Sequence, residues 1–291
     1  MADNNLIELI KVLRERTGAG LMDCKGALLN NDLDLDKACD WLREKGLAKA
    51  AKKADRIAAE GLTAIKGCEK CGKYVILEVN CETDFVAKNP EFKELTENLA
   101  KQVVKANPAD VDALLASTCP CCNMKVEDKI KEKIAKIGEK ITVRRFIRVE
   151  GCPATYIHNG KIGVLMNTDK ADEAVQKDVC LHIASAAPEF VSRNEIPQAV
   201  IDEETRIEMG KEDLAKKPEN IRAKIVEGRV NKLMAQKCLV EQPFIKNPDV
   251  TIADYINGHF AIKSFTRWVL GEGLEKRNDN FAEEVANQMK G

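Results

Sequence analysis

Aromatic residues are scarce in this chain of 291 residues, at 4% of the total. Proteins that bind single-stranded nucleic acid stack the bases on aromatic side chains, so this composition argues against that class of function. Neither sign of charge predominates, because the chain has 46 Lys and Arg and 47 Asp and Glu, for a net charge of −1. Without a global positive field, we expect neither nucleic acid nor an anionic membrane as a direct partner.

Long apolar runs are also missing. No stretch approaches the ~18 residues that a membrane-spanning helix needs. The opening Met-Ala-Asp-Asn-Asn lacks the basic and apolar regions of a signal peptide. We therefore expect a cytoplasmic protein. With 44% hydrophobic and 32% charged residues, the chain is long enough for two or three modules of ~100–200 residues each.

Catalytic motifs are not found. His158, His182 and His259 lie far apart, without the spacing of metal ligands. The segment 67–73 fits the phosphate-binding pattern G-x-x-x-x-G-K, but Tyr74 replaces the required Ser or Thr, and the segment joins two predicted strands instead of opening a helix. The sequence therefore favours a protein that acts by binding over an enzyme, and requires no cofactor.

The cysteines, 11 in number, do not suggest disulfides in a large, apparently unsecreted chain. Most, such as Cys39 and Cys180, sit inside apolar patterns as small hydrophobic residues. Two Cys-x-x-Cys motifs supply the ligand set of a structural zinc site. The hypothetical ligands are Cys68, Cys71, Cys119 and Cys122, and Cys121 could replace either neighbour. A redox pair or isolated thiols are the alternatives.

Residues 1–55 are predicted to form a small bundle of three helices followed by a linker. Leu6, Ile10 and Leu13 recur at helical spacing, residues 17–20 interrupt the pattern, and a second helix follows over 21–29. Asp34 can cap a third helix that ends near Gly46. The segment from 47 to 56, rich in Ala, Lys and Arg, is either a solvated helical linker or a basic patch for an acidic partner.

The central part of the chain is predicted to be an α+β core of two subdomains, 56–140 and 141–275. Each contains a β-hairpin followed by a helix, with runs at 62–65 and 74–79 in the first hairpin and at 154–157 and 162–166 in the second. Short matches recur in the same order and suggest a duplication. They pair Gly72-Lys73 with Gly160-Lys161, Asn80 with Asn167, and Pro90-Glu91-Phe92 with Pro188-Glu189-Phe190.

Residues 194–238 are predicted to form an inserted antiparallel coiled-coil hairpin with an interruption at Pro218. Its apolar seam would contain Val200, Ile207, Leu214, Ile221, Ile225 and Leu233. The pattern leaves open whether this hairpin mediates self-association. Residues 276–291 carry Phe281, Val285 and Met289 at helical spacing, which predicts a C-terminal helix.

Several stretches carry a family signature. They are Arg14–Lys25, Ala50–Lys53, Leu77–Lys88, Ala135–Glu139 and Gly271–Gly273. Through them the chain resembles bacterial-type elongation factor Ts over nearly its whole length. The resemblance implies a ubiquitin-associated-like (UBA-like) N-terminal bundle, a two-part core, a coiled-coil excursion and a C-terminal helix. The two Cys-x-x-Cys motifs are not part of this family pattern.

The resemblance also implies a function, which is to bind the GTPase elongation factor Tu (EF-Tu) carrying GDP and to promote GDP release, so that GTP can enter. On this resemblance Thr83, Asp84, Phe85 and Val86 intrude near the nucleotide and disturb the bound Mg²⁺. Spacing alone also permits Phe85 to be a core residue that caps the hairpin.

Other contacts with EF-Tu are implied for Arg14, Leu21, Met22 and His158. The alternatives are that Leu21 and Met22 belong to the core of the bundle, and that His158 is an ordinary exposed turn residue. A rival function is a zinc-bearing adaptor for nucleic acid, against which balanced charge and scarce aromatics argue.

Overall fold

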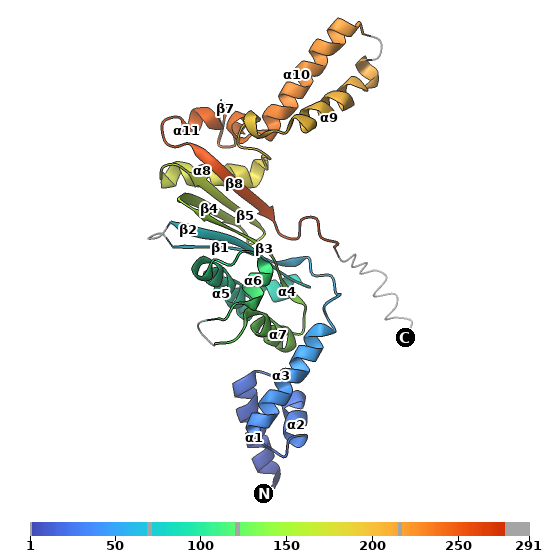
Figure 1. Ribbon diagram of the computed structural model, residues 1–291, viewed down its shortest axis with the longest axis vertical. Coiled ribbons are helices and arrows are strands. Elements are labelled where there is room, and N and C mark those ends of the chain that lie inside the picture. Colours follow the sequence, from blue (N-terminus) through green and yellow to red (C-terminus); the bar gives the residue numbers. More distant parts are fainter. Residues whose placement is uncertain (1, 69–71, 120–122, 215–216, 277–291) are drawn as a thin grey trace. The chain divides into compact units, whose positions relative to one another are not determined.

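A computed structural model describes residues 2–68, 72–119, 123–214 and 217–276 (Figure 1). These residues form a mixed α and β structure with small sheets. The chain divides into two compact units. The first contains residues 1–66, 75–148 and 269–291, and the second contains residues 67–74 and 149–268. The predicted C-terminal helix lies outside the described residues, except for its first position.

The first unit begins with three helices, α1 (Ala2–Thr17), α2 (Leu21–Leu29) and α3 (Leu35–Ala51). Their shared core includes Leu13, Leu28 and Ala38. Asp34 caps α3 as predicted, because its carboxylate accepts hydrogen bonds from the backbone of the next helical turn. The predicted end near Gly46 is wrong, and α3 continues to Ala51. The reason is tertiary packing, since Ala50 is buried in the core of the first unit.

The same unit contains most of a sheet of β1 (Glu60–Cys68), β2 (Lys73–Cys81) and β3 (Ile141–Glu150), in the order β1-β2-β3. Helices α5 (Pro90–Ala106), α6 (Val111–Ala116) and α7 (Val126–Ile137) cover it (Figure 1). Asn89 and Pro90 start α5 as predicted. The inward stripe of α5 packs on alternate residues of β2, and most residues of this core are aliphatic.

One carboxylate of β2 is also fully buried, at a position between the strand residues that face this core. Glu78, on β2, accepts hydrogen bonds from Arg144 Nη1 at 3.0 Å, Arg145 Nε at 2.7 Å and the backbone of Gly271 at 2.9 Å. Gly271 has φ +69°, and a Cβ there would lie 2.3 Å from the carbonyl oxygen of Ala59. Only glycine fits this position. The buried acid thereby fixes the returning C-terminal segment to the sheet.

The second unit contains β4 (Cys152–His158), β5 (Ile162–Thr168) and β8 (Ile262–Val269). Strands β4 and β5 form the predicted antiparallel hairpin, in which His158 pairs with Ile162. Asn159 and Gly160 both have positive φ, which gives a type I′ turn. Helix α8 (Glu173–Ala186) packs on this sheet together with β6 (Pro243–Phe244), β7 (Asn247–Thr251) and α11 (Ile252–Ile256).

The predicted repeat is only partly equivalent in structure. Gly72-Lys73 and Gly160-Lys161 both lead into the second strand of a hairpin. Pro90-Glu91-Phe92 opens α5, whereas Pro188-Glu189-Phe190 follows the end of α8. The last match therefore does not mark equivalent positions.

Two helices of the second unit, α9 (Gln198–Met209) and α10 (Glu219–Lys237), run side by side as a hairpin (Figure 1). The predicted seam is partly wrong, because Ile207 and Ile221 are exposed. Val226, Val230 and Met234 form the buried stripe of α10 instead. Helix α9 ends before Leu214, which lies in a separate 3₁₀ turn, so a seven-residue repeat cannot continue to it along one helix.

Near the end of this hairpin, the charged residue Glu208 is buried, whereas the predicted seam placed an apolar residue there. Its carboxylate pairs with Lys211 and with Arg229, and Arg229 also pairs with Asp213. The helical hairpin is present, and its coiled-coil character stays a prediction. No helix among the described residues is both long enough and apolar enough to cross a membrane.

Candidate functional site

The predicted Thr-Asp-Phe-Val sequence follows β2. Thr83 caps a short helix, α4 (Asp84–Lys88), and the other three residues form the start of that helix. We call residues 82–88 the β2–α4 segment. Thr83 precedes the helix in extended conformation, and its hydroxyl accepts a hydrogen bond from the backbone of Val86 at 3.4 Å. Ala87 and part of Val86 pack on the core of the first unit. The strand and the core thus fix one side of the segment, and its other side faces solvent.

Phe85 lies on the exposed side of the segment. Its exposed fraction is 80%, the highest of the large hydrophobic residues described as exposed. This exposure excludes the alternative that Phe85 caps the hairpin as a core residue. Aromatic side chains that anchor protein interfaces are buried only when the partner binds, and Phe85 is free to act in this way.

Asp84 and Lys88 flank Phe85 on the same short helix. Lys88 Nζ lies 2.6 Å from Asp84 Oδ2 and 5.9 Å from the centre of the Phe85 ring. The Lys88 side chain is 72% exposed and the Asp84 side chain 44%. Pairs of this kind contribute only about 0–1 kcal/mol, so a partner can replace Lys88 as the cation beside Asp84 at little cost.

Glu139 supports the β2–α4 segment from a distant part of the chain. One carboxylate oxygen accepts hydrogen bonds from the backbone N–H groups of Glu82 at 3.1 Å and Thr83 at 2.9 Å. The other oxygen accepts from the Thr83 hydroxyl at 2.6 Å. Sequence reasoning gave Glu139 no role. The available signal was that it ends one of the stretches with family resemblance, Ala135–Glu139.

The side chain of Glu82 in turn binds the backbone next to Glu139. Its carboxylate accepts a hydrogen bond from the backbone of Lys140 at 2.6 Å and pairs with Arg56 at 3.4 Å. Lys140 Nζ in turn donates to the carbonyl of Arg56 at 2.9 Å, and Lys53 donates to the carbonyl of Gly138. The basic residues after α3 therefore contact the supports of the β2–α4 segment, which neither interpretation of this linker anticipated.

Next to the segment, Cys81 ends β2. Its thiol donates to the carbonyl oxygen of Thr83 at 3.1 Å. Burial, followed by the nearby charge of Glu139, raises the pKa of Cys81 to about 12. A thiol with this pKa stays protonated at neutral pH and is unreactive as a nucleophile.

The predicted contact residues of the bundle lie at its surface. Leu21 and Met22 open α2 and are 55% and 73% exposed, which excludes the alternative that they belong to the core. Cys24 and Leu28 of the same helix point inward. Arg14, near the end of α1, is exposed as well.

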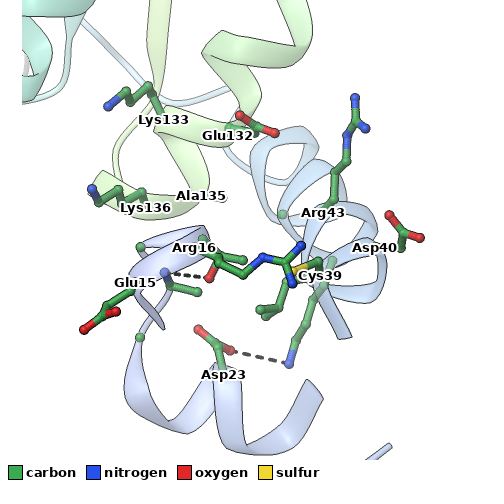
Figure 2. A pocket seen from close by; sticks show the side chains of 17 residues that line it. Glu15, Arg16, Asp23, Cys39, Asp40, Arg43, Glu132, Lys133, Ala135 and Lys136 are labelled. Atoms are coloured by element: carbon green, nitrogen blue, oxygen red, sulfur yellow. Dashed lines mark hydrogen bonds and ion pairs between the residues drawn. The ribbon is translucent and has the colours of Figure 1, made fainter. Parts of the chain in front are cut away.

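A pocket of about 540 Å³ lies between the bundle and α7 within the first unit (Figure 2). Acidic and basic side chains alternate around it, among them Glu15, Arg16, Asp23, Arg43 and Lys136. Asp23 pairs with Lys45 at 3.5 Å, and Lys136 pairs with Glu91 outside the pocket at 2.6 Å. Because the lining carries both signs of charge and several of these side chains pair with residues outside the pocket, it selects neither an anion nor a cation.

The histidines separate into two structural residues and one at a surface turn. Buried His182 contacts Gln242 Oε1 at 2.9 Å and accepts from the backbone of Ile245, and burial lowers its pKa. His259 pairs with Asp172 at 2.7 Å. His158 is exposed at the type I′ turn of the second unit, with Nδ1 3.2 Å from the Tyr156 hydroxyl.

The zinc hypothesis falls partly outside the described residues, since Cys71, Cys121 and Cys122 lie there. Cys68 ends β1 and is half-buried, and Cys119 is buried with Lys129 Nζ 3.8 Å from its sulfur. Among the residues that the structure describes, no three His, Cys, Asp or Glu side chains are grouped to hold a metal ion. The hypothesis stays a prediction.

The chain was compared with models of protein families. The model described as elongation factor TS matches residues 82–272. The match begins at the first residue of the β2–α4 segment, and it includes Glu139, His158 and the α9–α10 hairpin.

Proposed function

Because the chain belongs to the elongation factor Ts family and has the translation-elongation role of that family, we propose that it binds EF-Tu in its GDP-bound form and accelerates the release of GDP. It acts by binding, forms and breaks no covalent bond, and needs no cofactor of its own. GTP then enters the vacated site.

The observation that carries this proposal is the exposure of Phe85 on a supported segment. An 80% exposed phenylalanine is unfavourable in water and gains free energy when a partner buries it. Because Glu139 and the core hold the segment from behind, Phe85 can be pressed into a partner without the segment collapsing. We call Phe85, with the segment that supports it, the wedge.

Asp84 gives the wedge a charge. GTPases hold the phosphates of the nucleotide with a Mg²⁺ ion that bridges and neutralises them. A carboxylate brought close to this ion, or to its ligands, weakens the arrangement that retains GDP. Asp84 can serve in this way because its pairing with Lys88 is exposed and weak.

Thermodynamic linkage explains how binding becomes nucleotide release. If the factor and GDP each bind EF-Tu, and each weakens the binding of the other, the same coupling free energy acts in both directions. The factor then loosens GDP, and an incoming nucleotide loosens the factor. The free energy gained when Phe85 is buried is what offsets the distortion of the nucleotide site.

We propose that Arg14, Leu21, Met22 and His158 add contacts with EF-Tu. Leu21 and Met22 offer exposed apolar surface at the start of one helix. His158 offers an imidazole on a tight turn. Such contacts increase the affinity of the complex without changing the nucleotide site directly.

The release of labelled GDP from EF-Tu tests the proposal. The wild-type chain should accelerate release, and Phe85→Ala should slow it by roughly tenfold to a hundredfold, as expected for an interface anchor worth about 1.4–2.8 kcal/mol. Ile147→Ala is the matched control, since Ile147 is also an exposed apolar side chain of the first unit. Equal rates for wild type and Phe85→Ala would refute the wedge. Failure of the wild type to accelerate release would refute the exchange function.

A further inference from the structure

We propose that Glu139 is a positioning residue for nucleotide exchange: its carboxylate holds the β2–α4 segment so that Phe85 is presented at the right orientation. Glu139 thereby sets the maximal rate of GDP release and contributes little to the affinity for EF-Tu. This inference rests on the proposed function, and it assigns to Glu139 a role separate from that of a contact residue.

The hydrogen bonds that the Glu139 carboxylate accepts from this segment use both of its oxygens. The donors are two consecutive backbone N–H groups and one hydroxyl, all belonging to Glu82 and Thr83. Hydrogen bonds to an ionised carboxylate are roughly twice as strong as neutral ones. The two backbone donors are fixed in direction, so their common acceptor defines the orientation of the peptide that enters α4.

Helix α4 is too short to fix its own orientation. It has only five residues, far below the ~12–15 at which an isolated helix becomes even marginally stable. Its cap is the Thr83 hydroxyl, which accepts from the backbone of Val86 while it donates to Glu139. This hydroxyl therefore links the position of Glu139 to the helical turn that carries Phe85.

Glu139 is itself held in place. It follows Gly138, which ends α7 with φ +90°. In return for the support that Glu139 gives to residue 82, the Glu82 carboxylate accepts a hydrogen bond from the backbone of Lys140 at 2.6 Å. Each segment thus accepts backbone hydrogen bonds of the other with its own carboxylate, although Glu82 and Glu139 lie 57 positions apart in the sequence. Neither segment can rotate without breaking these hydrogen bonds.

The kinetics of GDP release from EF-Tu, measured over a range of factor concentrations, separate positioning from contact and from folding. For Glu139→Ala we expect the maximal rate to fall by about tenfold, the factor that corresponds to about 1.4 kcal/mol. The half-saturating concentration should change by no more than about twofold, a difference of about 0.4 kcal/mol. A variant that is only partly folded would lower the active concentration and leave the maximal rate per complex unchanged.

Conservative variants sharpen the test. Glu139→Gln keeps one acceptor oxygen for the two backbone N–H groups, and its amide can donate to the Thr83 hydroxyl, so it should restore part of the maximal rate. Thr83→Val keeps the shape of the side chain and removes the hydroxyl, so it should also lower the maximal rate. The matched control is Glu127→Gln, which removes a surface charge from α7, and it should behave as wild type.

Hydrogen exchange of the isolated chain gives a readout that does not depend on EF-Tu. The backbone amides of Glu82 and Thr83 should be protected in the wild type and should lose protection in Glu139→Ala. An unchanged maximal rate in both Glu139→Ala and Thr83→Val would overturn the inference, as would a rise in the half-saturating concentration alone. A wild type without exchange activity would instead overturn the proposed function, which keeps the two failures distinct.

Discussion

Two carboxylates of the first unit play different roles with similar hydrogen bonds. Glu78 is fully buried and accepts from two arginine side chains and one backbone N–H. Glu139 is half-buried and accepts from two backbone N–H groups and a hydroxyl. The difference lies in what each carboxylate holds. Glu78 joins β2, β3 and a returning segment at a fully buried position, whereas Glu139 joins the end of α7 to a surface segment that carries an exposed aromatic residue.

One kind of interaction thus serves the fold in one place and function in another. A buried charge must be neutralised, since removing one partner leaves the others unpaired in a medium of low polarity. A half-buried carboxylate that receives backbone donors can be removed with less damage to the fold, because water can replace it. Glu78 variants should therefore lose stability, and variants of the β2–α4 segment should lose activity.

The largest expected effect is on stability. Glu78→Ala should lower the free energy of unfolding by about 3–5 kcal/mol, because it removes a buried carboxylate that two partly buried guanidinium groups share as an acceptor. Denaturant titration measures this loss. Glu97→Ala is the matched control, since Glu97 makes only exposed pairs with Lys66 and Lys101, and a loss of similar size in that variant would contradict the special role of Glu78.

Phe85→Ala should give the opposite result. Its free energy of unfolding should stay within about 0.5 kcal/mol of wild type, as is usual for exposed positions, while GDP release slows by the factor given under the proposed function. The same denaturant titration provides the comparison. A large loss of stability would mean that Phe85 supports the fold, and it would remove the contrast between the two regions.

Acid should act more strongly on the Glu78 region. Burial by itself would raise the pKa of Glu78, but the hydrogen bonds from Gly271, Arg144 and Arg145 outweigh it and hold the pKa below its ordinary value. The stability that ionised Glu78 contributes is therefore present above its unfolded pKa of about 4.3 and is lost as the pH falls through the lower folded value.

The free energies of unfolding of wild type and Glu78→Gln, measured from neutral pH downward, test this dependence. The difference between them should be constant above about pH 5 and should shrink in more acidic solution, since only the wild type has this group to protonate. A difference that stays constant to the lowest pH at which both chains fold would show that the ionisation of Glu78 does not contribute.

The smallest expected effect belongs to Lys88. Its pair with Asp84 is exposed, so Lys88→Ala should change the free energy of unfolding by less than about 1 kcal/mol. The same variant also removes one cation beside the Asp84 carboxylate, and GDP release should be unchanged or slightly faster. Marked slowing would show that Lys88 is itself a contact residue and would revise the role given to Asp84.

Local sequence chemistry was sufficient to predict many elements. Asp34 and Asn89 cap the helices that follow them, and Asn159-Gly160 makes the turn that these residues favour. Such signals act over a few residues, so they need no knowledge of the rest of the chain. The family resemblance likewise located the β2–α4 segment, because its residues are contiguous.

Contacts between distant segments could not be predicted in this way. Periodicity shows which face of a helix is apolar, but not how far packing will extend that helix, as for α3 beyond Gly46. It also placed Ile207 in a seam where the structure buries the neighbouring Glu208 with its basic partners. An apolar pattern does not reveal a buried ion pair whose partners lie elsewhere in sequence.

The sequence by itself therefore determined many of the helices and strands and the family, and it indicated the residues of the proposed wedge, because each is encoded in short contiguous patterns. Only the tertiary structure decided that Phe85 is exposed, that Glu139 supports it, and that Gly271 must be glycine because the backbone of Ala59 passes beside it. The physical reason is that exposure, hydrogen bonding and steric fit at these positions depend on residues that folding brings together from far apart in the chain.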